Sequence, residues 1–98
     1  MRVPLSFVML AALAGPSLAD AKKDAKVHLD KAAAAHKAGR YDDARKELEI
    51  AYTLDPQPAL LYAIGQVHVM QGQCPQAITF YERFLESKPG EAQAAKAR

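Results

Sequence analysis

Two stretches of the sequence carry the same sparse pattern at an offset of thirty-three residues. Residues 38–56 read AGRYDDARKELEIAYTLDP, residues 71–89 read QGQCPQAITFYERFLESKP, and the two align without a gap. A fixed period of this length marks stacked structural repeats, because each unit cannot bury its apolar face alone. The repeat therefore constrains the fold more than any other feature. The identical positions are Gly39 and Gly72, Ala44 and Ala77, Glu49 and Glu82, and Pro56 and Pro89.

Each copy predicts a pair of helices. Residues 20–38 are rich in Ala, Lys and Asp and contain no Gly or Pro, which favours a helix that Gly39 ends. Asp42 and Asp43 then lie where the negative charge suits the start of a second helix. Its apolar positions recur near the helical period, and Pro56 closes it. These apolar positions are Ala44, Leu48, Ala51, Tyr52 and Leu54.

The second pair follows directly. Pro58 opens a strongly apolar helix that Gly72 ends, and Pro75 falls at the first turn of the next helix, where its missing N–H costs nothing. That last helix has one broad apolar face. Residues 91–98, EAQAAKAR, predict a short partial helix after it. The chain is therefore predicted to be all-α, and the apolar face is formed by Ile78, Tyr81, Phe84 and Leu85.

The pattern resembles the tetratricopeptide repeat (TPR) family, whose motif is a helix–turn–helix of about 34 residues with small residues at packing points and a closing proline. GRYDDA and YTLDP are close to the family consensus. The resemblance implies an α-α superhelix of two repeats, over residues 25–57 and 58–90, with residues 91–98 as a partial capping helix. The matching repeat-packing residues are Ala32, Gly39, Tyr41, Ala44, Ala51 and Pro56, then Gly65, Gly72, Ala77, Tyr81 and Pro89.

The resemblance also implies how the helices pack. Small residues let the two helices of a hairpin approach closely, and Tyr41 and its counterpart Cys74 would fill the turns. His28 stands where the family has an aromatic residue, and Lys31 stands where it has a large apolar one. We therefore expect the first helix to pack loosely. Phe84 occupies a position where Ala is common.

Residues 1–19 have the layout of a secretory signal peptide. Arg2 precedes an apolar run over residues 5–14, and small residues place cleavage after Ala19 or Ala21. The alternative, an uncleaved anchor, is disfavoured because the run is shorter than the roughly 20 residues that span a bilayer. We expect residues 20–98 to form the TPR-like domain, periplasmic or secreted and free of the membrane. The Cys-Pro turn and DPQPALLYAIGQ resemble exported bacterial TPR proteins.

Charge and composition narrow the function. The chain has 13 Lys and Arg against 11 Asp and Glu, and removal of Arg2 with the leader brings the net charge near +1. This balance gives no reason to expect nucleic acid as a partner. No nucleophile–base motif, phosphate loop or metal-ligand spacing occurs, so we expect no enzyme, no cofactor and no metal. Cys74 is interpreted as a small buried residue, and an intermolecular disulfide is the alternative.

The resemblance places a partner-binding surface on the first helix of each hairpin. This concave groove is mostly apolar and predicts a protein or peptide partner, with Tyr62 as the best anchor, whereas it lacks the residues of a carboxylate clamp. Residues after Pro89, or a second copy in a homo-oligomer, are alternative occupants. The alternative function is that of a truncated or self-associating fragment of a larger envelope TPR protein. The predicted groove residues are Leu29, Ala33, His36, Tyr62, Gln66, Val69 and Met70.

Overall fold

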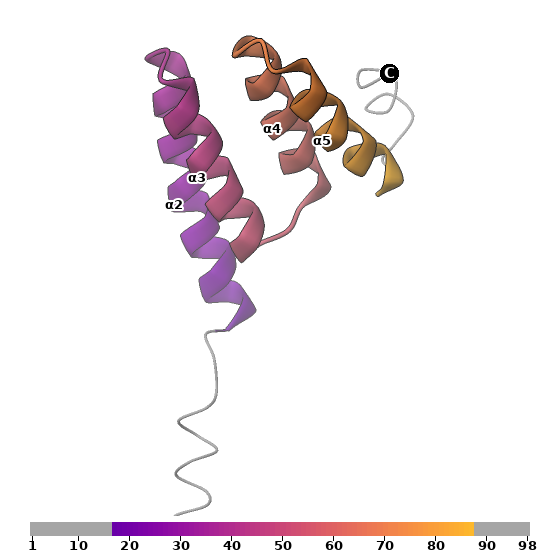
Figure 1. Ribbon diagram of the computed structural model, residues 1–98. Coiled ribbons are helices and arrows are strands. Elements are labelled where there is room, and N and C mark those ends of the chain that lie inside the picture. Colours follow the sequence, from indigo (N-terminus) through magenta and orange to yellow (C-terminus); the bar gives the residue numbers. More distant parts are fainter. Residues whose placement is uncertain (1–16, 88–98) are drawn as a thin grey trace, which may run out of the picture.

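The computed structural model describes residues 17–87, which form four helices in two packed pairs (Figure 1). The all-α prediction and the two helix pairs are confirmed. Pro89, the partial helix predicted over residues 91–98 and most of the predicted signal peptide lie outside the described residues. The helices are α2 (Leu18–Lys37), α3 (Tyr41–Leu54), α4 (Pro58–Met70) and α5 (Cys74–Glu86).

The helix ends follow the local signals in the sequence. α2 begins two residues before the predicted start, because the Ser17 side chain accepts a hydrogen bond from the Asp20 N–H at 3.2 Å and caps the helix. Gly39 and Gly72 adopt φ of 78° and 72° just after α2 and α4. This left-handed conformation ends a helix and is unstrained in glycine. The turn within the first hairpin and the turn within the second therefore have the same geometry, as the repeat predicts.

The first hairpin is built on alanine. Ala25, Ala32 and Ala35 of α2 are buried against the buried face of α3, where Ala51 is fully inaccessible. Small side chains bring the two helices close together. The loose packing predicted for α2 is therefore wrong for the middle of the helix: His28 does not replace a core aromatic ring but pairs its Nδ1 with Glu47 Oε2 at 2.6 Å, and Lys31 points to solvent.

The second hairpin uses one glycine and large rings. A Cβ placed on Gly65 would lie 2.7 Å from Tyr81 Cε1, so the Tyr81 ring lies against the bare backbone of α4. Phe84 is only 2% exposed and packs 5.4 Å from the Tyr62 ring. The same position in the first hairpin is Ala51. Rings thus fill the second hairpin where methyl groups fill the first.

Two sequence-based expectations about the turn before α5 and its apolar face need correction. Cys74 is exposed, so it neither fills the turn nor behaves as a buried residue, unlike its half-buried counterpart Tyr41. Ile78 is 56% exposed. The apolar residues of α5 are therefore divided between two faces, since Phe84 points to α4 while Ile78 points away from the hairpin.

The two hairpins meet where α3 packs on α4. Leu48 of α3 and Ile64 and Val67 of α4 form one buried cluster, which Ala32 joins from α2. Polar contacts flank it: Lys22 Nζ lies 3.5 Å from Asp55 Oδ1, and Gln71 Nε2 donates to Asp42 Oδ1 at 3.4 Å. Among the helices of residues 17–87, none is both long enough and apolar enough to cross a bilayer.

Candidate functional site

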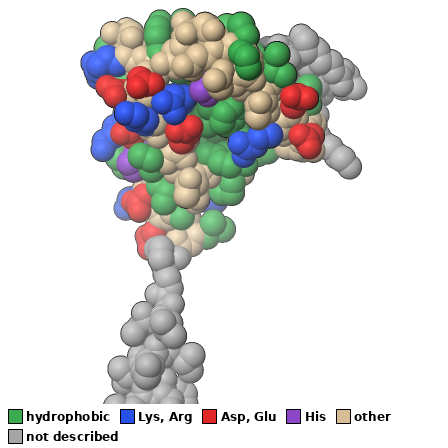
Figure 2. Space-filling model, viewed as in Figure 1, with side chains coloured by type: hydrophobic (Ala, Val, Ile, Leu, Met, Phe, Trp, Pro, Cys, Tyr) green, Lys and Arg blue, Asp and Glu red, His purple; other side chains and the backbone are tan. Residues whose placement is uncertain are grey.

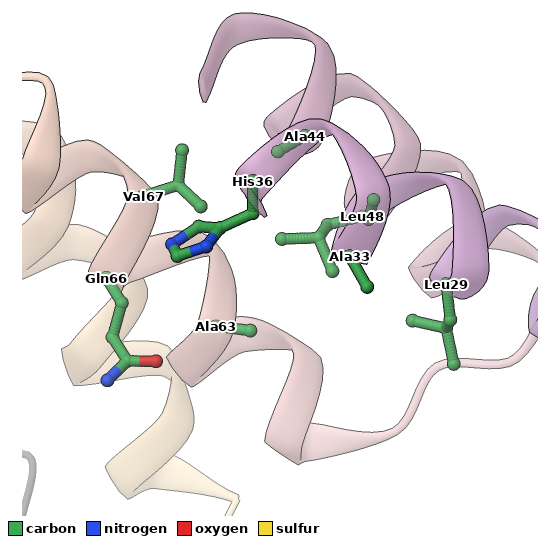
Figure 3. Close-up of a pocket in the computed structure, with 9 residues that line it drawn as sticks. Leu29, Ala33, His36, Ala44, Leu48, Ala63, Gln66 and Val67 are labelled. Carbon is green, nitrogen blue, oxygen red and sulfur yellow. The ribbon is translucent and has the colours of Figure 1, made fainter. Parts of the chain in front are cut away.

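An open cavity of about 210 Å³ lies where α2, α3 and α4 meet (Figure 3). α2 and α4 form its two walls, and α3 contributes the floor. Both walls carry a small side chain, Ala33 on α2 and Ala63 on α4, which leaves the space between the helices open. The lining is almost wholly apolar, and consists of Leu29, Ala32, Ala33, His36, Ala44, Leu48, Ala63, Gln66 and Val67.

Two polar side chains, His36 and Gln66, lie at the rim of this cavity (Figure 3). The His36 ring is held from both sides, edge-on to the Tyr41 ring at 5.4 Å and with its Nε2 at 3.2 Å from Met70 Sδ. Both His36 and Gln66 are exposed, so they keep contact with water. An apolar interior with a few polar groups at its edge suits a ligand that carries its own backbone hydrogen-bonding groups.

A second hollow continues the cavity along α2. It shares Leu29 with the first cavity and extends toward the linker between α3 and α4, where Lys22 and Lys26 lie. Both lysines are paired, Lys22 with Asp55 and Lys26 with Asp30, each at 3.5 Å. The groove formed by the two hollows therefore has balanced charge at this end. Hydrophobic side chains gather in the middle of the face that Figure 2 shows, between areas of mixed charge.

Of the predicted groove residues, four line the cavity: Leu29, Ala33, His36 and Gln66. Met70 is half exposed and reaches the cavity rim through its contact with His36. Val69 is also half exposed but does not line the cavity.

Tyr62 lies elsewhere. Its ring packs at 5.4 Å on both Tyr81 and Phe84 of α5. Tyr62 occupies in the second hairpin the place that Leu29 has in the first, and Leu29 faces the cavity between hairpins. The counterpart surface at Tyr62 is the outer end of the second hairpin. Tyr62 does not line the 210 Å³ cavity and is therefore not its anchor.

Several cavity residues were missed by the sequence reasoning. Ala63 and Val67 belong to the side of α4 that faces the first hairpin, and Leu48 belongs to α3, whereas the prediction named other positions of α4 and placed the groove only on the first helix of each hairpin. The signal was present in part. A small residue at Ala63, among the larger apolar residues of α4, leaves space that the buried cluster does not fill.

An ion-pair network on α3 lies away from the cavity. Arg45 donates to Asp42 Oδ1 at 2.9 Å and to Glu49 Oε1 at 3.1 Å. The hydrogen bond from Arg45, followed by that from Gln71, lowers the pKa of Asp42 below its usual value, and the hydrogen bond to Asp42 raises the pKa of Arg45. Because Gln71 is the residue that caps the C-terminal end of α4, this network ties the two hairpins together and has a structural role.

The cavity can bury an apolar group of a ligand, and His36 and Gln66 can form hydrogen bonds to the ligand. The described part of the chain holds no cluster of three or more metal-ligating side chains. His36 has a thioether and an aromatic ring as its neighbours, and within residues 17–87 no carboxylate is hydrogen-bonded to it to orient it as a general base. The arrangement can exclude water from an apolar side chain and hold the polar groups beside it.

The family model for the tetratricopeptide repeat matches residues 10–59 and, in a second match, residues 29–92. The matches overlap, and together they cover both hairpins. The chain belongs to the tetratricopeptide repeat family. Repeats of this family are typically non-catalytic modules that bind other proteins. A search of curated proteins found no match to this chain.

Proposed function

We propose that this chain is a non-catalytic adaptor, scaffold or assembly factor that binds a segment of a partner protein in the groove between α2 and α4. The observation that carries the proposal is the apolar cavity of about 210 Å³ at the junction of the hairpins. Apolar surface exposed in a concave site is stabilised by contact with an apolar side chain, and the groove accepts a peptide in an extended or helical form.

The size of the cavity indicates the kind of group that fills it. Sites for drug-sized molecules have volumes of roughly 300–1,000 Å³, and a cavity of about 150 Å³ is large enough for benzene. A cavity of about 210 Å³ therefore suits a single large side chain, such as Leu or Phe. The partner segment carries this side chain as its anchor, with its backbone near His36 and Gln66.

The paired lysines argue against recognition of a free carboxylate. Lys22 and Lys26 already have carboxylate partners at 3.5 Å, and a ligand carboxylate would have to displace Asp55 or Asp30. An exposed ion pair of this kind contributes only about 0–1 kcal/mol. Exchanging the present carboxylate for that of a ligand would therefore add little to the free energy of binding. The groove therefore selects its partner by the shape of the apolar anchor and not by charge.

We further propose that the protein is exported to the periplasm or secreted, with residues 1–19 as its signal peptide. The support is the order of Arg2, the apolar run and the small residues before Asp20. Cleavage after Ala19 or Ala21 removes Ser17, whose side chain caps α2. Loss of such a cap costs about 1 kcal/mol, so the first turn of α2 frays in the processed protein. N-terminal sequencing of protein from a periplasmic extract tests this cleavage.

Selection of peptides from a displayed random library tests the groove. We expect the selected peptides to share one large apolar residue. Ala33→Leu fills the cavity from its α2 wall and should weaken binding of such a peptide at least tenfold. Ala34→Leu is the matched control, because Ala34 is exposed on α2 but does not line the cavity. Equal weakening by both variants, or by neither, contradicts the assignment.

A further inference from the structure

The outer face of α5 carries an apolar stripe, here called the end seam: Cys74, Ile78, Tyr81 and Leu85. Its residues are spaced by four, three and four, which is the spacing that lets two helices pack along their length. Cys74 is exposed, Ile78 is 56% exposed, and Tyr81 and Leu85 are half-buried. The folding of residues 17–87 thus leaves Cys74 and Ile78 open, whereas Tyr81 offers only the part of its ring that does not lie against Gly65 of α4.

The internal repeat shows what kind of element fits on this stripe. At the offset of thirty-three residues, Tyr41 and Leu48 of α3 correspond to Cys74 and Tyr81 of the end seam. In the first hairpin those residues pack under α4, and Leu48 is only 9% exposed. The same geometry at the second hairpin calls for a helix. Its residues must match Leu60, Ile64 and Val67, which α4 uses to cover the first hairpin.

α2 of another copy does not meet this requirement. The positions of α2 that correspond to the three covering residues of α4 are Val27, Lys31 and Ala34. The central one is a lysine, so stacking of one copy on the next in the repeat direction would bury a charge, at a cost of several kcal/mol.

The sequence that follows α5 lacks large apolar residues at these positions. The residues that correspond to Leu60 and Ile64 are Gln93 and Ala97. They offer far less apolar surface than a leucine and an isoleucine, so they are poor substitutes for the helix that covers the first hairpin.

The end seam itself supplies the apolar residues that these segments lack. We propose that the end seam of one copy packs against the end seam of a second copy, in a two-fold symmetric dimer. Such an interface uses the same patch on both partners, so one apolar stripe is enough. Ile78 also supports this proposal. The corresponding residue of the first hairpin is Arg45, whose guanidinium pairs with two carboxylates, so the end seam has an apolar side chain where the first hairpin has a charged one.

The two α5 helices run antiparallel in this dimer. α3 and α4 pack in that sense in each chain, and antiparallel helices also oppose their dipoles favourably. A parallel pair would place Glu82 next to its own copy. In the antiparallel register the seam is symmetric about the midpoint between Ile78 and Tyr81. Ile78 then faces Tyr81 of the partner copy, and Cys74 faces Leu85 of the partner copy.

Light scattering and sedimentation of the processed chain under reducing conditions test the dimer. We expect a dimer that Ile78→Asp converts to monomer, with at least a tenfold rise in the dimer dissociation constant. Val27→Asp is the matched control, because Val27 is 50% exposed on α2 and lies outside the end seam. It should leave the dimer intact. A monomer at every concentration, or a dimer that only Val27→Asp disrupts, overturns the proposal.

Cysteine cross-linking tests the register. Leu85→Cys should form a covalent dimer with the native Cys74 under mild oxidation, and the double variant with Cys74→Ser should lose it. Glu86→Cys, which faces away from the seam, is the control and should cross-link far less. The unmodified chain should not cross-link. Its two Cys74 residues lie about 16 Å apart along antiparallel helices, against about 6 Å between the Cα atoms of a disulfide. Efficient cross-linking of the unmodified chain contradicts the antiparallel register.

Discussion

The substitution Gly65→Ala has two opposing effects on the free energy of unfolding: a steric clash with Tyr81 and a gain in helix propensity. A methyl group on Gly65 would lie 2.7 Å from Cε1 and 2.8 Å from Cδ1 of Tyr81, which is closer than real contacts allow. Overpacking of this kind costs roughly 1–3 kcal/mol. Replacing glycine by alanine inside a helix gains about 1 kcal/mol from helix propensity. Because Tyr81 is only half-buried and its ring can shift, we expect Gly65→Ala to destabilise the fold by about 1 kcal/mol.

The first hairpin supplies the control for this prediction. Ala32 and Leu48 occupy there the places of Gly65 and Tyr81, and both are buried. In a Tyr81→Leu background the clash is removed, so Gly65→Ala should become stabilising by about 1 kcal/mol.

Thermal unfolding followed by circular dichroism provides the measurement, with a shift of about 4–8 °C per kcal/mol for a domain of this size. The four chains of the cycle should show a coupling of about 1–3 kcal/mol. If Gly65→Ala raises the melting temperature of the unmodified chain, or the coupling is below about 0.5 kcal/mol, the assigned contact is wrong.

Three further predictions concern stability. Phe84→Ala removes a ring that is 2% exposed and should cost about 3–5 kcal/mol, so urea unfolding should lose much of its cooperativity; an unchanged midpoint refutes this. Burial, and then the neighbouring Tyr62, raise the pKa of Tyr81 above 10.0, so the folded state holds this proton more tightly than the unfolded state. Its contribution to stability is complete below about pH 10 and is lost as the pH rises through the folded pKa. Tyr81→Phe should make the urea midpoint less sensitive to alkaline pH, and an unaltered pH dependence contradicts it. Glu47→Gln removes the charge but keeps an oxygen that can accept a hydrogen bond from His28 Nδ1, so it should cost about 1 kcal/mol although both side chains are only about a quarter exposed; a loss of about 3 kcal/mol or more in a urea titration would contradict this.

The helices were predictable from the sequence because their signals are local. Gly39 and Gly72 end α2 and α4, and Pro58 and Pro75 lie at the start of α4 and α5. Each of these residues acts on its own backbone, so its effect does not depend on distant contacts. The start of α2 was placed two residues late because the cap at Ser17 lies within the stretch interpreted as a signal peptide.

The site was only partly predictable, since a helix face is defined by its neighbours. The helical period indicates that Ile78 and Phe84 are apolar positions of one helix, but only packing on α4 shows that Phe84 is buried while Ile78 is not. The same reason explains Tyr62, whose position in α4 gave no sign of the rings on α5 that surround it. Within residues 17–87, Cys74 is exposed because α4 covers its counterpart Tyr41, and no helix of this range packs on α5 in the same way.

The cavity between α2 and α4 is proposed to hold one apolar side chain of a partner segment. Intermolecular NOEs in the complex with a selected peptide test this most directly. We predict NOEs from the anchor side chain of the peptide to the methyl groups of Ala33, Ala63 and Val67, which line the cavity. NOEs that instead connect the peptide to Ile78 and Leu85, with none to these three residues, would contradict the account.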